Sequence, residues 1–225
     1  MAIPVLGFPV LNRYDHAENM VKSIDVPVDR MVIVDNGGKY KQGVFGAHVI
    51  SPGANLGWGA SINLMMRTNL QAPWWFFTND DMIFCHGDLA EVEKFMQNAS
   101  GPTIGMMDGC GFAAFCVNPG AIEAVGWFDE SYHPAYCEDC DWGVRASRLG
   151  IQIHEIPGHS IHIGSQTIRG EGTNNDRTYQ RNVAYHRAKW GGGPREEVFA
   201  TPFDKGGDPS ITVAPKLSRL RDLSW

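Results

Sequence analysis

Two groups of acidic residues have the types and spacing to do chemistry. Asn79-Asp80-Asp81 directly follows an apolar run, and Glu138-Asp139-Cys140-Asp141 opens a helical pattern that includes Arg145. Carboxylates at the end of a buried strand can hold a hard divalent cation, which prefers oxygen ligands and often shares them with phosphate. Carboxylates crowded at a helix start raise the pKa of one member, as a general base requires. The structural alternatives are an acidic turn and a helix start stabilised by its dipole.

Asp35 and the segment from Asn55 to Asn63 are further candidates for ligand binding. Asp35 ends a β-branched run and precedes Asn36-Gly37-Gly38, so its carboxylate can accept hydrogen bonds from a base N–H or a sugar hydroxyl. A simple turn is the alternative, because Asn-Gly is a strong hairpin signal. Small residues open the helix that follows Asn55, so a phosphate or ribose could lie close to its N-terminus. The glycine spacing matches neither a Walker loop nor a dinucleotide fingerprint.

These residues must be positioned by strands and helices that alternate along the chain. Apolar runs of strand length cover residues 3–8, 31–34, 47–50, 73–77 and 112–117, with short strands expected over 151–163. Helical spacing covers residues 15–24, 57–70, 121–125, 139–149 and 176–190. This alternation predicts an α/β fold with a mainly parallel sheet and helices on both faces. Because ligands bind beyond the carboxyl ends of such strands, the candidate residues are expected around one crevice.

Composition narrows the class of protein. The chain has 225 residues and a net charge of 19 − 25 = −6, which disfavours nucleic-acid binding through bulk positive charge. Its 26 glycines are in excess and indicate sharp turns or close backbone approach to a ligand. No apolar stretch approaches the roughly 18 residues of a membrane span, and the N-terminus has no basic region of a signal peptide. We therefore expect a cytoplasmic location.

The order of these motifs resembles the GT-A fold glycosyltransferases of family 2, in particular their rhamnosyltransferase-like members. These are inverting enzymes that use nucleotide-activated sugars. The matching segments, in chain order, are Pro9 to Arg13, Ile33 to Gly37, Asn55 to Asn63, Asn79-Asp80-Asp81 at the DxD position, Gly126 to Glu130, Glu138 to Asp141 with Arg145, and His162 to Ser165. Asn182 to Gly192 is similar to the C-terminal helix of the rhamnosyltransferase-like members. Asn79 stands where the family has the first aspartate of DxD. The resemblance implies an α/β GT-A fold, Rossmann-like, with a small antiparallel part on the acceptor side.

The resemblance also implies how the parts of the chain are divided. Residues 1–192 would form the GT-A domain, with a nucleotide-sugar half of about 1–100 and an acceptor half of about 101–192, followed by a tail over 193–225. The activity would be hexosyl or deoxyhexosyl transfer from a nucleoside-diphosphate sugar, with the help of Mn²⁺ or Mg²⁺. The acceptor stays open among a glycan, a lipid-linked sugar, a protein and a modified nucleic acid.

Roles for individual residues follow from the same resemblance. The nucleotide and sugar would be bound by a set of residues on the donor side: Pro9, Val10, Asn12, Asp35, Asn55, Gly57, Asn63 and Asp80. Asp81 and His162 would hold the metal ion, and Asp139 would be the general base. Trp127, Glu138 and Asp141 would lie on the acceptor or sugar side. A loop over 165–175 would close over the donor.

Two alternatives and one oligomeric state remain open from the sequence. A nucleotidyltransferase of the same topology would want a glycine-rich basic loop after the first strand, but Asn12-Arg13-Tyr14-Asp15 has no glycine. A sugar-nucleotide-binding protein without catalysis is the second alternative, and Glu138, Asp139 and Asp141 argue against it. Leu217, Leu220 and Leu223 predict a short amphipathic helix that docks on the domain or on a second copy, which would make a homodimer through the tail.

Overall fold

The structure is a computed structural model that describes residues 2–164 and 175–211. Its strands are β1 (Leu6–Val10), β2 (Met31–Asp35), β3 (His48–Ile50), β4 (Trp75–Thr78), β5 (Met82–Ile83), β6 (Ile104–Met107), β7 (Gly111–Val117), β8 (Ile153–Ile156) and β9 (Ile161–His162). Its helices are α1 (Tyr14–Lys22), α2 (Trp58–Arg67), α3 (Asp88–Gln97), α4 (Pro119–Val125), α5 (Glu138–Arg148) and α7 (Asn175–Trp190). The predicted helix over 176–190 and the predicted strands over 31–34 and 112–117 are confirmed with small shifts at their ends.

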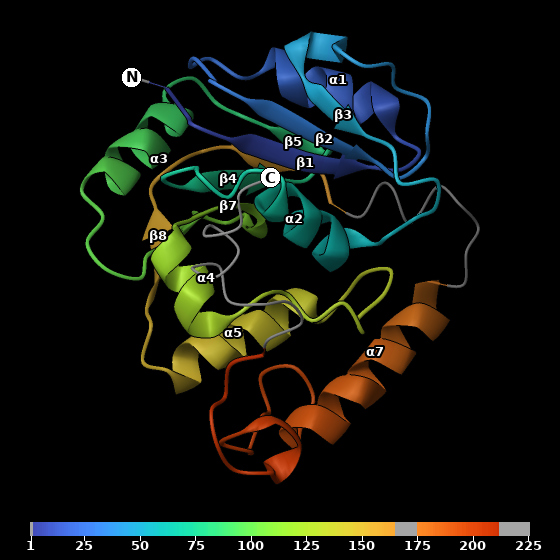
Figure 1. Cartoon of the computed structure of the whole chain (residues 1–225), viewed down its shortest axis with the longest axis vertical. Coiled ribbons are helices and arrows are strands. Elements are labelled where there is room, and N and C mark those ends of the chain that lie inside the picture. The colour runs from blue at the N-terminus through green and yellow to red at the C-terminus, as the bar shows by residue number, and fades with distance from the viewer. Residues whose placement is uncertain (1, 165–174, 212–225) are drawn as a thin grey trace.

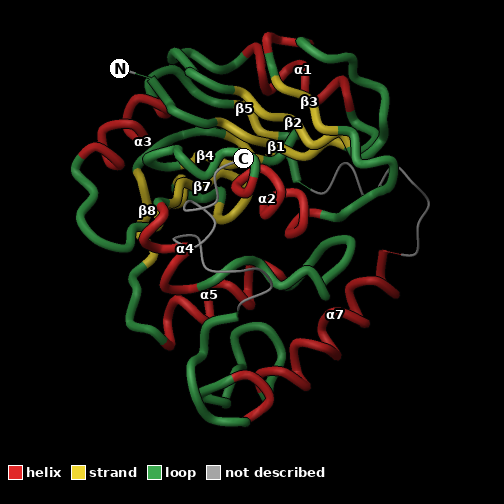
Figure 2. Tube along the Cα trace, in the orientation of Figure 1, coloured by secondary structure: helices red, strands yellow, loops and turns green. Residues whose placement is uncertain are grey.

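Seven strands form a central sheet in the order β3-β2-β1-β4-β7-β6-β8. The pairs among β1 to β4 are parallel, as is β6 with β8, whereas β7 runs antiparallel to both of its neighbours. Figure 2 shows these strands gathered in one part of the molecule, with helices around them. The mainly parallel α/β sheet expected from the sequence is therefore confirmed, as is a small antiparallel sheet, which β5 and β9 make.

Helices cover both faces of the sheet (Figure 1). They do so because the strands present apolar side chains to both faces, where two separate clusters of buried residues form. On one face, Leu6, Phe8 and Val10 of β1 pack with residues of α1 and α3. On the other face, buried residues of α2, α4 and α5 pack against Trp75 and Phe77 of β4. A helix over 88–97 was not among the predicted elements, although Leu89, Val92 and Met96 have helical spacing.

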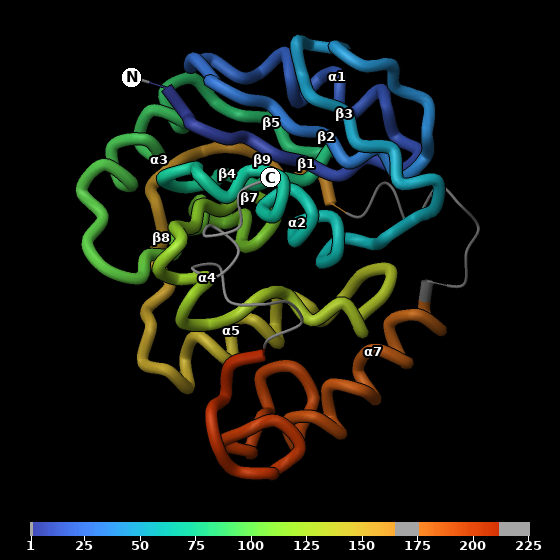
Figure 3. The backbone as a smooth tube through the Cα atoms, viewed as in Figure 1, coloured from blue at the N-terminus to red at the C-terminus, as the bar shows by residue number. Residues whose placement is uncertain are grey.

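The chain runs from the sheet to a helical end of the molecule. Figure 3 shows the blue and cyan segments at one end and the orange and red segments, α7 and the residues after it, at the other. The described part of the predicted tail folds back onto the domain, where Ile211 forms a β-bridge with Gly126. The predicted tail helix around Leu217 to Leu223 and most of the predicted loop over 165–175 lie outside the described residues. In the described part of the chain, no helix combines the length and the apolar character needed to cross a bilayer.

Candidate active site

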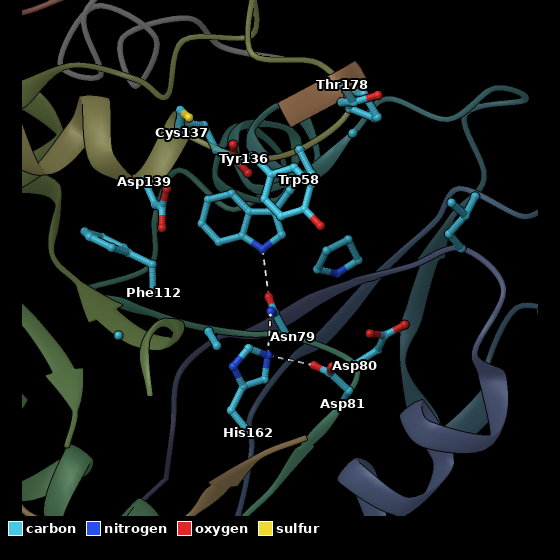
Figure 4. Close-up of a pocket in the computed structure, with 18 of the residues that line it drawn as sticks. Trp58, Asn79, Asp80, Asp81, Phe112, Tyr136, Cys137, Asp139, His162 and Thr178 are labelled. Carbon is cyan, nitrogen blue, oxygen red and sulfur yellow. Dashed lines mark hydrogen bonds and ion pairs between the residues drawn. The ribbon is translucent and has the colours of Figure 1, made fainter. Parts of the chain in front are cut away.

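A cavity of about 610 Å³ opens at the carboxyl edge of the sheet (Figure 4). Its walls come from the ends of β1, β2 and β4, the start of β7, the start of α2 and the loop that leads into α5. Most of the residues selected from the sequence line it: Pro9, Val10, Asn55, Gly57, Asp80, Asp81, Glu138, Asp139 and His162. The crevice expected beyond the strand ends therefore exists, and it joins segments from both halves of the chain.

Asp81 and His162 meet because β5 and β9 pair in a fixed register. Met82, which follows Asp81, is opposite His162, and the amide of Ile163 donates to the carbonyl oxygen of Asp81 over 3.1 Å. This places His162 Nε2 3.1 Å from Asp81 Oδ1. The Asp81 side chain is only 4% exposed, so its carboxylate is fixed at the cavity wall. An imidazole nitrogen and a carboxylate oxygen that lie side by side can supply two of the ligands of a divalent cation.

Asn79 is tied into the same group. Its Oδ1 accepts a hydrogen bond from Trp58 Nε1 over 2.8 Å, and its Nδ2 lies 3.3 Å from His162 Nε2. Figure 4 shows this chain of contacts, from the indole of Trp58 through Asn79 and His162 to Asp81. Trp58 and Asn79 therefore hold the imidazole next to the carboxylate without adding a charge.

The fit of these residues to a metal ion is that of a partly open site. No cluster of three or more His, Cys, Asp and Glu side chains suited to a metal occurs within residues 2–164 and 175–211. Asp81 and His162 supply one oxygen and one nitrogen ligand, which Mn²⁺ accepts, and the cavity leaves room for phosphate and water oxygens. The donor set fits a cation that is shared with a bound phosphate.

The helix α5 begins at the opposite side of the cavity. Tyr136 and Cys137, with φ of 79° and 71°, turn the chain sharply before Glu138. Such left-handed conformations cost about 1–3 kcal/mol at residues other than glycine and concentrate at functional sites. Gly57 also has a positive φ of 80°, and a Cβ there would come within 2.5 Å of the carbonyl oxygen of Pro134. The start of α2 and the loop before α5 are thus packed directly together.

Glu138 and Asp139 have different environments, although they are neighbours in the chain. Glu138 is 5% exposed, and its Oε2 has no hydrogen-bond partner among the described residues. Burial is the main cause that raises the pKa of Glu138 well above its usual value, and the negative charge of Asp139 is the second cause. Asp139 is half-buried, and its Oδ1 accepts the amide hydrogen of Cys140 over 2.8 Å. The sequence predicted one raised pKa in this acidic group, and the structure assigns that pKa to Glu138.

Asp141 does not line the cavity but lies in a buried network of charges. It is fully buried and binds Arg145, Lys189 and the indole nitrogen of Trp190, the last over 2.8 Å. Lys189 is also fully buried and lies 2.8 Å from Asp129. Burial alone would raise the pKa of Asp129, but the Lys189 ammonium lowers it below its usual value. The network joins α7 to α5 and so holds the helix that presents Glu138 and Asp139.

The structure places the other selected residues outside the cavity walls. Asp35 is fully buried and accepts hydrogen bonds from Tyr14, over 2.6 Å, and from the amides of Gly37, Gly38 and Tyr40. Its carboxylate stabilises the turn after β2, and its neighbour Asn36 lines the cavity instead.

Asn63, Trp127 and Asn12 are also set back from the cavity. Asn63 is fully buried, and its amide exchanges hydrogen bonds with the backbone of Phe128 over 2.9 and 3.0 Å. Trp127 is 1% exposed and has the guanidinium of Arg67 over its ring at 5.2 Å. Asn12 follows β1 just after the lining residues Pro9 to Leu11. Asn63 and Trp127 thus support the loop that leads to α5.

The aromatic lining of the cavity was not selected from the sequence. Trp58, Phe112, Tyr136 and Tyr179 all line it, and Tyr136 and Tyr179 meet edge to face at 5.8 Å between ring centroids. They come from four separate segments, so no spacing in the sequence groups them. Trp58 alone carried a local signal, because it stands in the glycine-flanked start of α2. Aromatic faces of this kind suit the stacking of a base or a sugar ring.

The charged side chains that line the cavity within the described residues are acidic. Four lining residues carry carboxyl groups, namely Asp80, Asp81, Glu138 and Asp139, and no lysine or arginine is among the described lining residues. A diphosphate would be repelled by these walls unless a cation lay between them, because bound divalent ions set the local potential in such sites.

Comparison with known proteins identifies the fold. No protein-family model matches the chain. A galactofuranosyl glycosyltransferase of Leishmania donovani is 38% identical over 74 residues, which are 32% of this chain and 17% of that protein.

Solved structures match a larger share of the chain at low identity. A Pyrobaculum calidifontis mannosyltransferase in complex with GDP-Man and Mn²⁺ has a TM-score of 0.52 and 13% identity, over 68% of this chain and 54% of that one. Residues 1–349 of TarS from S. aureus match with a TM-score of 0.53 and 12% identity, over 68% of this chain and 57% of that one. A Drosophila β1,4-galactosyltransferase 7 mutant with manganese, UDP-Gal and xylobiose matches with a TM-score of 0.51 and 11% identity, over 79% of each chain. The chain thus has the GT-A fold, and it spans just over half the length of the first two matched structures.

Proposed function

We propose that this GT-A fold chain is an inverting, metal-dependent glycosyltransferase that moves a sugar from a nucleoside-diphosphate sugar to an acceptor hydroxyl. One observation carries the proposal: the Asp81–His162 pair and Asp139 line one cavity whose described lining has carboxyl groups but no basic residue. Such a cavity suits a diphosphate only together with a divalent cation. The mannosyltransferase and galactosyltransferase of the same fold, which hold a nucleotide sugar with manganese, support the same conclusion.

Asp81 and His162 would hold the Mn²⁺ or Mg²⁺, and Asn79 and Trp58 would keep the imidazole in place. When bound, the ion would neutralise the charge of the diphosphate and of the departing nucleoside diphosphate. The aromatic rings of Trp58 and Tyr136 would border the sugar and exclude water from it.

Asp139 is suited to be the general base. Its carboxylate accepts one backbone hydrogen bond, from Cys140, and no cation pairs with it in the described part of the chain. It would take the proton of the acceptor hydroxyl while the hydroxyl oxygen bonds to the anomeric carbon and the bond from that carbon to the phosphate oxygen breaks. A single displacement of this kind inverts the anomeric configuration.

Glu138 would act as a hydrogen-bond donor, not as a base. Burial raises the pKa of this carboxyl group well above its usual value, which favours its neutral form, and its Oε2 has no hydrogen-bond partner in the described structure. A neutral carboxyl group donates a hydrogen bond, so Glu138 would hold a sugar hydroxyl of the donor. Hexosyl or deoxyhexosyl transfer remains part of this proposal.

A binding and turnover panel tests the proposal. The full chain would be incubated with the diphosphates of uridine, guanosine, thymidine and cytidine and with their sugars, with and without Mn²⁺, and its melting temperature measured. We expect at least one nucleotide to stabilise the protein only when Mn²⁺ is present, because ligand binding to the folded state raises its stability. No Mn²⁺-dependent stabilisation by any of them would refute the proposal. Release of nucleoside diphosphate needs a hydroxyl that accepts the sugar, from water or from an added sugar, and binding with no release to either would indicate a protein that binds without catalysis.

A further inference from the structure

A second cavity lies on the other side of Asp139. It has a volume of about 380 Å³ and is bounded by the outer face of α5 and by the segment after α7. Figure 1 shows that segment curling beneath α5. Phe112, Asp139 and Cys140 line both cavities, so they form the boundary between the two. In Figure 4, Phe112 and Asp139 lie at the end of the main cavity away from Asp80.

The second cavity differs from the first because it contains basic side chains. Arg148 and Arg195 both line it, and neither is in an ion pair with a carboxylate among the described residues. Arg148 uses Nε and Nη2 to bind the carbonyl oxygens of Phe199 and Glu197, over 3.2 and 3.0 Å. These hydrogen bonds connect α5 to the segment after α7, and the guanidinium places a positive charge beside the cavity.

The carboxylate of Glu197 is held by the protein itself. Its Oε1 lies 2.8 Å from His186 Nε2 and accepts the amide hydrogen of Arg195 over 2.9 Å. This hydrogen bond closes the turn in which Arg195 has a φ of 72°. The backbone of Arg195 is thus fixed, whereas no hydrogen bond of its side chain is made within the described structure. A guanidinium whose N–H donors are not used within the described structure can bind the planar oxygen pairs of phosphate and carboxylate groups.

We propose that the second cavity binds the acceptor and that this acceptor carries a phosphate or carboxylate group, which Arg195 and Arg148 recognise. This inference rests on the proposed function, since it requires Asp139 to be the base. Because Asp139 lines both cavities, a hydroxyl at the edge of the second cavity would meet its carboxylate while the donor lies in the main cavity. The volume of the second cavity falls within the roughly 300–1,000 Å³ of small-molecule sites. It suits a monosaccharide with one anionic group.

Calorimetric titration of the full chain tests the acceptor site. The probes are mannose 6-phosphate, glucuronate, inorganic phosphate and neutral mannose, at low ionic strength with EDTA so that no metal-bound anion occupies the main cavity. We expect at least one of the three anions to bind at least about tenfold more tightly than mannose, since charge-assisted bonds are about twice as strong as neutral ones. Preference for the phosphates or for glucuronate identifies the anionic group.

Variants of Arg195 make the test specific. Arg195→Ala should weaken binding of the anion about tenfold, Arg195→Lys should retain part of it because the charge remains, and Arg195→Glu should abolish it. Arg30→Ala, in an exposed arginine before β2, is the matched control and should bind like the natural protein. Equal binding of charged and neutral sugars, or anion binding that survives Arg195→Glu, would overturn the inference.

A parallel titration with nucleoside diphosphate and Mn²⁺ separates the two proposals. Nucleotide binding should be the same in the natural protein and in all Arg195 variants, because Arg195 does not line the main cavity. Nucleotide binding without Arg195-dependent anion binding contradicts only the acceptor inference. Loss of Mn²⁺-dependent nucleotide binding in every form of the protein contradicts the proposed function instead.

Discussion

Trp58 Nε1 donates a hydrogen bond to Asn79 Oδ1 over 2.8 Å, and this contact orients the amide whose nitrogen lies 3.3 Å from His162. Asn79 stands where the glycosyltransferase family that the sequence resembles has the first aspartate of its DxD motif. Its amide oxygen accepts from the indole, and its amide nitrogen is directed at the imidazole. Asn79 therefore orients His162, whereas Asp81 supplies the negative charge beside it.

Trp58→Phe removes this hydrogen bond and keeps an aromatic ring against Phe115 and Phe128. We expect the affinity for nucleoside diphosphate with Mn²⁺ to fall up to about tenfold, since one hydrogen bond contributes about 0.5–1.5 kcal/mol. Titration calorimetry measures the change. Trp74→Phe, in a buried tryptophan outside the cavity, is the control and should leave the affinity unchanged. Equal affinities for the two variants would contradict the role given to Asn79.

Asp81→Ala removes the carboxylate that lies 3.1 Å from His162 Nε2. The dependence of nucleotide binding on Mn²⁺ should be lost, with an affinity at least about 10²-fold weaker, because hard cations are held by oxygen ligands and a negatively charged one is removed here. Asp108→Ala, in an exposed aspartate, is the matched control. The measurement is nucleotide binding with Mn²⁺ and with EDTA, and an unchanged difference between the two would refute Asp81 as a ligand.

Asp139→Asn should abolish transfer while nucleotide binding persists. The amide keeps the shape of the side chain and its hydrogen-bonding oxygen but cannot take a proton. The turnover number should fall by about 10²–10⁴, the usual contribution of a general base. Release of nucleoside diphosphate from the sugar nucleotide gives the rate, and Asp29→Asn, at an exposed position, is the control. A parallel loss of rate and of nucleotide affinity would argue that Asp139 binds the donor.

Glu138→Gln should stabilise the protein at neutral pH. The pKa of Glu138 is raised well above its usual value of 4.5, so above about pH 4.5 the unfolded chain releases a proton that the folded protein retains. The free energy of unfolding therefore falls as pH rises towards the folded pKa, by up to about 1.4 kcal/mol per pH unit. Glutamine does not titrate and abolishes this fall.

The measurement for Glu138→Gln is urea unfolding at pH 4.5 and at pH 7.5. The variant should gain stability over the natural protein between the two pH values, because only the natural protein loses the contribution of this group. Glu155→Gln, in an exposed glutamate of β8, should follow the natural protein. A constant difference between Glu138→Gln and the natural protein would show that Glu138 has no raised pKa.

Lys189→Met should destabilise the protein by about 3–5 kcal/mol, because it leaves the buried carboxylate of Asp129 without its cation and leaves Asp141 with Arg145 alone. Asp129 and Asp141 both bind Lys189, and all three side chains are at most 5% exposed. Chemical denaturation measures the loss. Lys22→Met, at an exposed position, should stay within about 0.5 kcal/mol of the natural protein. A loss below about 1 kcal/mol would mean that α7 is held by its apolar contacts instead.

The sequence by itself determined the class of fold and the edge of the sheet at which the cavity opens. Apolar runs that end in Asp35 and in Asn79-Asp80-Asp81 are local signals, because a buried strand and the polar turn after it are written in adjacent residues. Parallel strands bring such ends to one edge without further information. The proximity of Pro9, Asn55 and Asp80 could therefore be expected from the order of the elements alone.

Only the tertiary structure decided which acidic residues face the cavity. Asp139 and Asp141 are two residues apart, but a helix rotates them to different sides, so that one borders both cavities and the other lies buried beside Lys189. The position of Lys189 depends on how α7 packs on α5, which no local pattern encodes. Asp35 likewise turned inward because four donors from the surrounding turn and from Tyr14 satisfy its carboxylate. Side-chain roles of this kind depend on partners that are distant in the chain, and those partners are specified only by packing.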